Sequence, residues 1–246
     1  MGEEWRDEAD RFVGYYDIMG FSRLVRTKPP KDVYQILRTF QDVASEAEAL
    51  ARQIRGTDGS GRALARPGRL LRFVSFSDSI VLFSRDSSDV CSLAVTLASL
   101  KLFLATLSGG FVIRGAWSCG RATADFKHSL FFGSPVIDAY ELAEAQEWFG
   151  VVEHESAQTD TLRVLSVMGP DEIPLTEAYT VPLKSGARTL SAVTWPVFAR
   201  SAADVAYALM SAGVDDGGPD VARYKQSTLS FLKVVRDKYC AGQPES

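Results

Sequence analysis

The spacing of apolar side chains divides the first part of the chain into separate elements. An apolar run over residues 11–17 predicts a strand that ends at Asp17. Two further runs, 70–76 and 79–84, are separated only by Ser77 and Asp78, which is typical of a tight β-hairpin. Between the first strand and this hairpin, residues 31–55 predict an amphipathic helix. Apolar side chains recur there every three or four positions, at Val33, Ile36, Leu37, Phe40, Val43, Ala44, Ala47, Leu50 and Ile54.

The remaining elements alternate in type along the chain. The glycine-rich residues 56–69 predict a loop between the helix and the hairpin. After the hairpin we expect a helix over 88–107, a strand over 111–120, a helix over 134–148, short strands after about 160, and helices near 201–212 and 220–239. This order predicts an α/β fold, a ferredoxin-like split βαβ sandwich with a central, mainly antiparallel sheet and helices mainly on one face. No repeat or long linker interrupts it, which favours a single domain over 1–246, with a core of about 10–155 and a C-terminal extension, 156–246, packed on that core.

Composition and charge exclude several classes of protein. The net charge of -4 argues against a broad basic surface for nucleic acid. The three scattered cysteines, Cys91, Cys119 and Cys240, favour neither a disulfide framework nor a zinc cluster and fit a reducing compartment. The first residues are charged, and the longest apolar stretch is interrupted by Lys101 and is too short to span a membrane. We therefore expect a soluble, cytoplasmic protein without membrane or nucleic-acid partners.

Two aspartates sit where burial of a carboxylate is unfavourable. Asp17 follows an apolar strand, and Asp78 lies at the tip of the predicted hairpin. In the predicted sheet the first strand and the hairpin are neighbours, so both carboxylates would lie at the same edge. Hard divalent cations such as Mg²⁺ or Mn²⁺ bind oxygen ligands of this kind, together with substrate phosphates. The alternative is that each aspartate only stabilises a turn, the turn before Gly20 or the hairpin itself.

Four segments in order resemble the motifs of class III nucleotide cyclases. They are "YYDIMGFS" and "SFSDSIVLF", each with an aspartate, "VIRGAWSCG", with an arginine, and "FGSPVIDAYELAE", a glycine-led helix. The resemblance extends from about Tyr15 to Glu153 and implies a class III cyclase-like fold. It also implies that about residues 10–155 form the catalytic core of a single cyclase domain.

The resemblance implies a role for each matching residue. Asp17 and Asp78 would be catalytic ligands of two Mg²⁺ or Mn²⁺ ions per site, assisted by the Ile18 carbonyl. Arg114 would contact a phosphate; the alternative is an arginine that faces solvent at the end of a strand. The family also implies a homodimer with shared active sites. Backbone N–H groups of the turn would bind the triphosphate of a nucleoside triphosphate, from Ile18, Met19, Gly20, Phe21 and Ser22.

The sequence departs from the purine cyclases at four positions. Val74 and Leu130 replace the residues that read a purine base, and Ile137 and Glu141 replace the asparagine and arginine that stabilise the transition state. The chain therefore resembles most closely the bacterial pyrimidine cyclases of anti-phage defence, which make cyclic UMP or cyclic CMP for a separate effector protein. Arg72 lies on the same strand face as Val74. Because its guanidinium only donates hydrogen bonds, it would favour the O4 acceptor of UTP over the amino group of CTP; alternatively it is simply solvated.

Two other functions fit parts of the same pattern. A degenerate cyclase fold could bind a nucleotide or a partner as a regulatory module without catalysis. A diguanylate cyclase has related topology, but its GGDEF motif is replaced here by "FSDSI".

Overall fold

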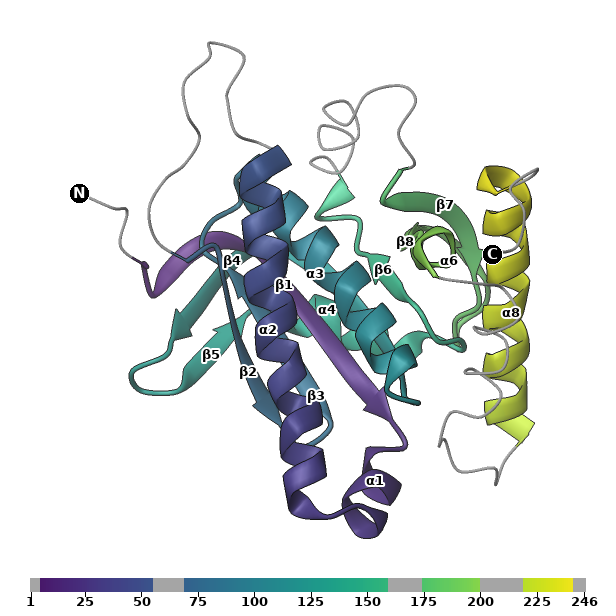
Figure 1. Cartoon of the computed structure of the whole chain (residues 1–246). Coiled ribbons are helices and arrows are strands. Elements are labelled where there is room, and N and C mark those ends of the chain that lie inside the picture. The colour runs from purple at the N-terminus through teal and green to yellow at the C-terminus, as the bar shows by residue number, and fades with distance from the viewer. Residues whose placement is uncertain (1–4, 55–68, 159–173, 200–218, 241–246) are drawn as a thin grey trace.

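The computed structural model describes residues 5–54, 69–158, 174–199 and 219–240, which build one eight-stranded sheet with helices packed against it (Figure 1). In chain order the elements are β1 (Glu8–Met19), α1 (Phe21–Thr27), α2 (Pro30–Ile54), β2 (Leu71–Phe76), β3 (Ser79–Ser84), α3 (Asp89–Ser108), β4 (Val112–Asp125), β5 (Leu130–Gly133), α4 (Ser134–Ala145), β6 (Val151–Glu153), β7 (Thr176–Val181), β8 (Arg188–Val193), α6 (Trp195–Phe198) and α8 (Pro219–Tyr239).

The fold is α/β, and the strands of its sheet pair mostly antiparallel, as predicted. The strand order is β2-β3-β1-β4-β6-β8-β7, and β5 pairs with β4 outside this path. Among the strand pairs of the described residues, only β4–β6 is parallel. The first strand therefore lies directly beside the β2–β3 hairpin on one side and β4 on the other.

Several element boundaries differ from those predicted. Strand β1 extends beyond Asp17 to Met19, because its ladder with β4 continues to Val112. Helix α4 ends at Ala145 and not at residue 148. There the backbone becomes extended at Gln146, whose buried side-chain amide donates to the Gly115 carbonyl at 2.8 Å. The predicted loop over 56–68 and the predicted helix near 201–212 lie outside the described residues.

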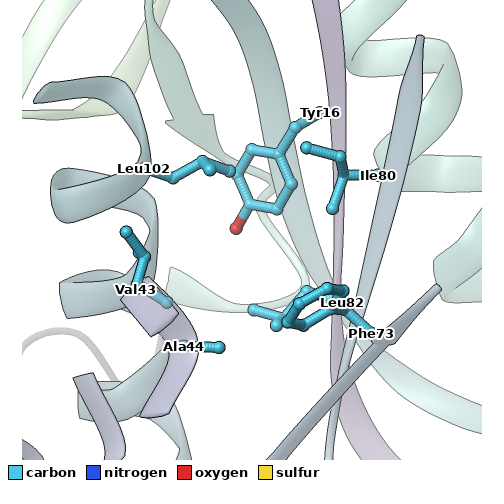
Figure 2. Close-up of a pocket in the computed structure, with 8 residues that line it drawn as sticks. Tyr16, Val43, Ala44, Phe73, Ile80, Leu82 and Leu102 are labelled. Carbon is cyan, nitrogen blue, oxygen red and sulfur yellow. The ribbon is translucent and has the colours of Figure 1, made fainter. Parts of the chain in front are cut away.

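Helices α2 and α3 cover one face of the sheet. The Tyr16 hydroxyl of β1 forms a 2.7 Å hydrogen bond with Ser99 Oγ of α3. Figure 2 shows Tyr16, Ile80, Leu82 and Phe73 from the strands facing Val43 and Leu102 of the two helices. These side chains line a small apolar cavity of about 20 Å³. This volume is close to that of one water molecule, and the lining is apolar, so the cavity is a packing gap and not a ligand site.

Helix α4 covers the opposite face and is an exception to the expected arrangement, in which the helices lie mainly on one face. Tyr140 of α4 packs edge-on against Tyr15, whose side chain points away from that of its neighbour Tyr16, with ring centroids 5.2 Å apart. The Pro135 carbonyl at the start of the helix accepts a 2.6 Å hydrogen bond from Ser118 Oγ of β4. The strands in the middle of the sheet are therefore covered on both sides.

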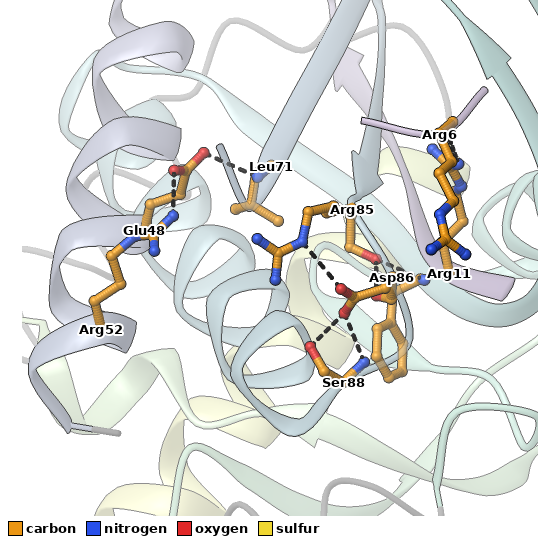
Figure 3. Close-up of polar contacts among 10 residues, drawn as sticks. Arg6, Arg11, Glu48, Arg52, Leu71, Arg85, Asp86 and Ser88 are labelled. Atoms are coloured by element: carbon orange, nitrogen blue, oxygen red, sulfur yellow. Dashed lines mark hydrogen bonds and ion pairs between the residues drawn. The ribbon is translucent and has the colours of Figure 1, made fainter. Parts of the chain in front are cut away.

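Polar contacts close the end of the hairpin that lies away from Asp78 (Figure 3). Glu48 of α2 accepts the Leu71 backbone N–H at 2.9 Å, and Asp86 accepts the Ser88 backbone N–H at 3.0 Å just before α3. Burial raises the pKa of Asp86, but hydrogen bonds from Ser88 and Arg85 outweigh it and lower the pKa to about 2. These contacts fix the strand ends to both helices.

Helix α3 is the central helix of the core. Among the described residues it alone has the length and apolar composition of a membrane span. The prediction that this apolar stretch is too short to span a membrane was therefore wrong. However, 78% of this stretch is buried inside the protein. Burial on nearly every side explains the absence of a polar face.

Strands β7 and β8 continue the same sheet, although both lie in the predicted extension after residue 155. Helix α8, drawn in yellow in Figure 1, packs beside them. Its Phe231 contacts the rings of Trp148 and Tyr179, at centroid distances of 4.9 and 4.7 Å. Trp195 stacks on Phe103 of α3 at 4.5 Å, which joins this aromatic cluster to the core.

Candidate active site

The two predicted metal ligands, Asp17 and Asp78, lie at the same end of the neighbouring strands β1 and β3. Asp17 pairs with Ser79 of β3 on one side and with Arg114 of β4 on the other. Asp78 occupies the turn before Ser79, and its backbone carbonyl accepts the Ile18 N–H at 2.9 Å. The hairpin tip is therefore tied to the residue that follows Asp17, which places the two aspartates close together.

Arg114 is buried and binds two carboxylates. Its Nε donates to Asp17 Oδ2 at 3.2 Å, and its Nη2 lies 3.1 Å from the same oxygen in an ion pair. Its Nη2 also donates to Glu144 Oε1 of α4, and its Nη1 donates to the Glu144 carbonyl at 3.5 Å. Because the residue is only 8% exposed, it is not the solvent-facing arginine of the alternative interpretation.

The site contains more negative than positive charge. Burial raises the pKa of Asp17, Arg114 opposes this effect, and the charges of Glu144 and Asp78 raise the pKa further. Asp17 and Glu144 therefore share one guanidinium, and Asp78 adds a third negative charge nearby. A cation would relieve both the burial and the repulsion of Asp17.

The donor set fits divalent cations that are shared with a substrate. In the described part of the chain, no group of three or more histidine, cysteine or acidic side chains is arranged to hold a metal. Asp17 and Asp78 would thus provide two carboxylates, and the other positions would belong to water and phosphates, as is usual for Mg²⁺. The Ile18 carbonyl as an additional ligand stays a prediction.

The turn after β1 carries the backbone N–H groups that were predicted to bind phosphates. Gly20 adopts a positive φ of 78°, which L-residues with a side chain rarely adopt, and this conformation turns the chain from β1 into α1. The Ile18 N–H is already bonded to Asp78 and is not available, which corrects the expectation for this residue. The Gly20 carbonyl accepts the N–H groups of Arg23 and Leu24. The N–H groups of Phe21 and Ser22 come before these first bonds of α1, so they have no partner within the helix.

Within one chain, Arg72 lies far from Asp17, Asp78 and Arg114. It pairs with Phe83, whereas Phe76 of the same strand lies level with Ser79 and Asp17, so about 13 Å of strand separates Arg72 from the carboxylates. Its guanidinium stacks over the rings of Trp5 and Phe126, at 4.7 and 5.2 Å from their centroids. A role for Arg72 in base recognition stays a prediction.

Sequence reasoning did not identify Glu144, Tyr15 or Tyr140 as part of the site. Burial raises the pKa of Tyr15, whose hydroxyl forms a 2.7 Å hydrogen bond with Ser79 Oγ. The spacing Ile137, Tyr140, Glu144 follows the helical period and could have placed these side chains on one face of α4. The sequence pattern does not indicate on which face of the sheet this helix packs.

Comparisons with known proteins give only distant similarities. No family model and no curated protein matches the chain. Among solved structures, the chain is similar to the catalytic core of a rhodopsin-guanylyl cyclase with converted specificity in complex with ATPαS, at 13% identity and a TM-score of 0.48, covering 76% of this chain and 96% of that one.

Two structures of a bacterial light-regulated adenylyl cyclase are similar as well. One has 10% identity, a TM-score of 0.44 and coverage of 76% of this chain and 91% of that one. The other has 9% identity, a TM-score of 0.46 and coverage of 92% and 58%. At such identities and TM-scores these similarities decide nothing about activity, so the chemistry of this chain has to be inferred from its own residues.

Proposed function

We propose that this protein is a nucleotide cyclase, which converts a nucleoside triphosphate to the 3′,5′-cyclic monophosphate and pyrophosphate. The observation that carries this proposal is the convergence of Asp17, Asp78 and the buried Arg114 at one edge of the sheet. It joins three of the four segments that resemble the cyclase motifs. Carboxylates for cations beside an arginine for phosphates are the groups that phosphoryl transfer requires.

The chain's own residues would mainly position charge. Mg²⁺ or Mn²⁺ held by Asp17, Asp78 and the Ile18 carbonyl would supply Lewis acidity to the ribose 3′-hydroxyl and charge neutralisation to the phosphates. Arg114 would donate hydrogen bonds to a phosphate oxygen, and the N–H groups of Phe21 and Ser22 would do so at the turn. The 3′-hydroxyl would lose its proton to water as its oxygen bonds to the α-phosphorus, and the bond from that phosphorus to the bridging oxygen of the β-phosphate would break, so that pyrophosphate leaves.

The exposed apolar side chains support a homodimer with shared sites. Leu130, Phe132, Ile137 and Tyr140 lie within eleven residues of β5 and α4 and are 54%, 60%, 56% and 48% exposed. Large apolar side chains gathered in this way are typical of protein interfaces. Leu130 and Ile137 also occupy positions where the cyclase resemblance expects substrate-binding groups, so the interface would adjoin the substrate.

Mixing Asp17→Ala, which should be inactive, with Arg72→Ala, which should be active but less selective, tests the shared site. A heterodimer of these chains should recover up to one intact site, and with it the UTP preference that neither variant shows alone. Activity is measured on mixtures after sedimentation analysis, with Ile137→Glu as a variant expected to dissociate the dimer. A fully active monomer at micromolar concentration would contradict this proposal.

We further propose UTP as the substrate, ahead of CTP, with the cyclic UMP read by a separate effector in anti-phage defence. Val74 and Leu130 cannot form the polar contacts that hold a purine. This departure from the purine cyclases, and the resemblance to pyrimidine cyclases, support the pyrimidine assignment. The stacking of Arg72 on Trp5 and Phe126 fixes its guanidinium, which could then meet a base bound to the other subunit.

A substrate comparison tests both the activity and its specificity. Purified protein with Mn²⁺ and each of the four ribonucleoside triphosphates should give cyclic product from UTP first, and chromatography with mass detection identifies it. Arg72→Ala should reduce the preference for UTP over CTP by about tenfold, the loss of one good hydrogen-bonded contact. Preference for a purine would refute the pyrimidine assignment; unchanged selectivity would refute only the role of Arg72.

The second candidate is a regulatory module that binds a nucleotide without converting it. The observation that favours it is the absence of transition-state groups at Ile137 and Glu141, which are both exposed on α4. This candidate predicts nucleotide binding with no cyclic product for any of the four triphosphates. The same substrate comparison therefore separates the two functions.

A further inference from the structure

We propose that Glu144 competes with the substrate's phosphates for Arg114 and so sets the affinity of the site for triphosphate. This inference rests on the proposed role of Arg114 as a phosphate contact. Glu144 stands outside the positions that the cyclase resemblance assigns. Its carboxylate nevertheless contacts the guanidinium directly, in an ion pair with Arg114 Nη2.

The nitrogens of the Arg114 guanidinium all have a partner. An arginine has five N–H groups in a rigid fork. Asp17 accepts the one on Nε and lies 3.1 Å from Nη2 in an ion pair, while the Glu144 carboxylate accepts one on Nη2 and the Glu144 carbonyl accepts one on Nη1. A bidentate contact with a phosphate needs two parallel N–H groups on one side of the fork, so a present partner has to leave before a phosphate can bind in this way.

Glu144 is the partner that can leave. The Asp17 side chain is 13% exposed and fixed in the ladder opposite Arg114, whereas the Glu144 side chain is 32% exposed and longer. Glu144 also has a second cation within reach, because its Oε2 lies 4.0 Å from Lys184 Nζ. The Lys184 backbone N–H donates to the Ala145 carbonyl at 2.8 Å, which keeps this lysine beside the end of α4.

The arrangement therefore has two states that differ in the partner of Glu144. Without substrate, Glu144 binds Arg114 and neutralises it together with Asp17. With substrate, phosphate oxygens take the Arg114 donors, and Glu144 keeps Lys184 as its partner at closer range than the present 4.0 Å, which offsets part of the unfavourable free energy of breaking the ion pair with Arg114. Lys184 thus favours phosphate binding indirectly, through Glu144.

Calorimetry with inorganic tripolyphosphate in excess EDTA tests the inference without metal or turnover. Glu144→Gln should bind tripolyphosphate about tenfold more tightly than the wild type, which corresponds to about 1.4 kcal/mol. Asp138→Asn is the matched control, because it removes one negative charge six residues earlier in the same helix, and it should change the affinity by less than about twofold. Thermal unfolding verifies that both variants are folded.

A double-mutant cycle with Lys184 separates competition from general electrostatics. Lys184→Ala should weaken binding about threefold in the wild-type background and have no effect in the Glu144→Gln background, since the carboxylate that it attracts is then neutral. If Lys184 attracted the anion directly, its effect would persist in both backgrounds, and the inference would be wrong. Equal effects of Glu144→Gln and Asp138→Asn, or no tripolyphosphate binding by any variant, would overturn it as well.

The cyclase assay reports separately on the proposed function. The expected binding results combined with no cyclic product from any triphosphate would refute cyclisation and leave the competition by Glu144 in place. Cyclic product combined with unchanged binding in Glu144→Gln would refute only the inference about Glu144.

Discussion

Asp17→Ala and Asp78→Ala are each expected to lower cyclase activity by about a thousandfold or more while the protein stays folded. Loss of a carboxylate that holds a catalytic cation removes several kcal/mol of transition-state stabilisation, and each 1.4 kcal/mol, approximately, is tenfold in rate. The measurement is the initial rate with Mn²⁺ and the preferred triphosphate.

The structure explains why both variants should fold. In Asp17→Ala, Arg114 keeps its ion pair with Glu144. In Asp78→Ala, the bond from the Ile18 N–H is preserved, because it goes to the backbone carbonyl of Asp78 and not to its side chain. Asp17→Asn and Asp78→Asn are the isosteric controls and should be equally inactive. Substantial cyclase activity in any folded member of this set would refute the two-cation assignment.

Arg114→Ala is expected to lower the free energy of unfolding by about 3 kcal/mol and to abolish tripolyphosphate binding. The change leaves Asp17 and Glu144 without their shared cation in a largely buried site, and removal of one partner from a buried ion pair is strongly destabilising. The opposite change, loss of Asp17, leaves no such uncompensated charge. Urea denaturation measures the difference.

A second substitution separates the structural role of Arg114 from its role in binding. Arg114→Ala combined with Asp17→Asn removes one of the carboxylates left without a partner, so stability should return in part while tripolyphosphate binding stays absent. If Arg114→Ala is as stable as the wild type, the ion pairs contribute less than their burial implies. If it binds tripolyphosphate normally, Arg114 is not the phosphate contact.

The order of the elements and the position of the two aspartates were predictable from sequence. Local patterns determine both: short apolar runs mark the strands, helical spacing marks α2, a long apolar stretch marks α3, and the two-residue gap at Ser77 and Asp78 requires a tight turn. Once β1 and the hairpin are neighbours in a sheet, strand geometry alone places Asp17 beside Asp78.

The surroundings of the aspartates were decided by tertiary structure. Glu144 became part of the site because α4 packs on the face of the sheet opposite α3, and local spacing does not encode the choice of face. The distance between Arg72 and the carboxylates is a matter of register across three strands, and its stacking on Trp5 brings together residues 67 positions apart in the chain. The sequence by itself thus determined which residues carry charge near the strand ends. Packing of distant segments determined which of those charges meet, because burial and ion pairing depend on contacts that no local pattern records.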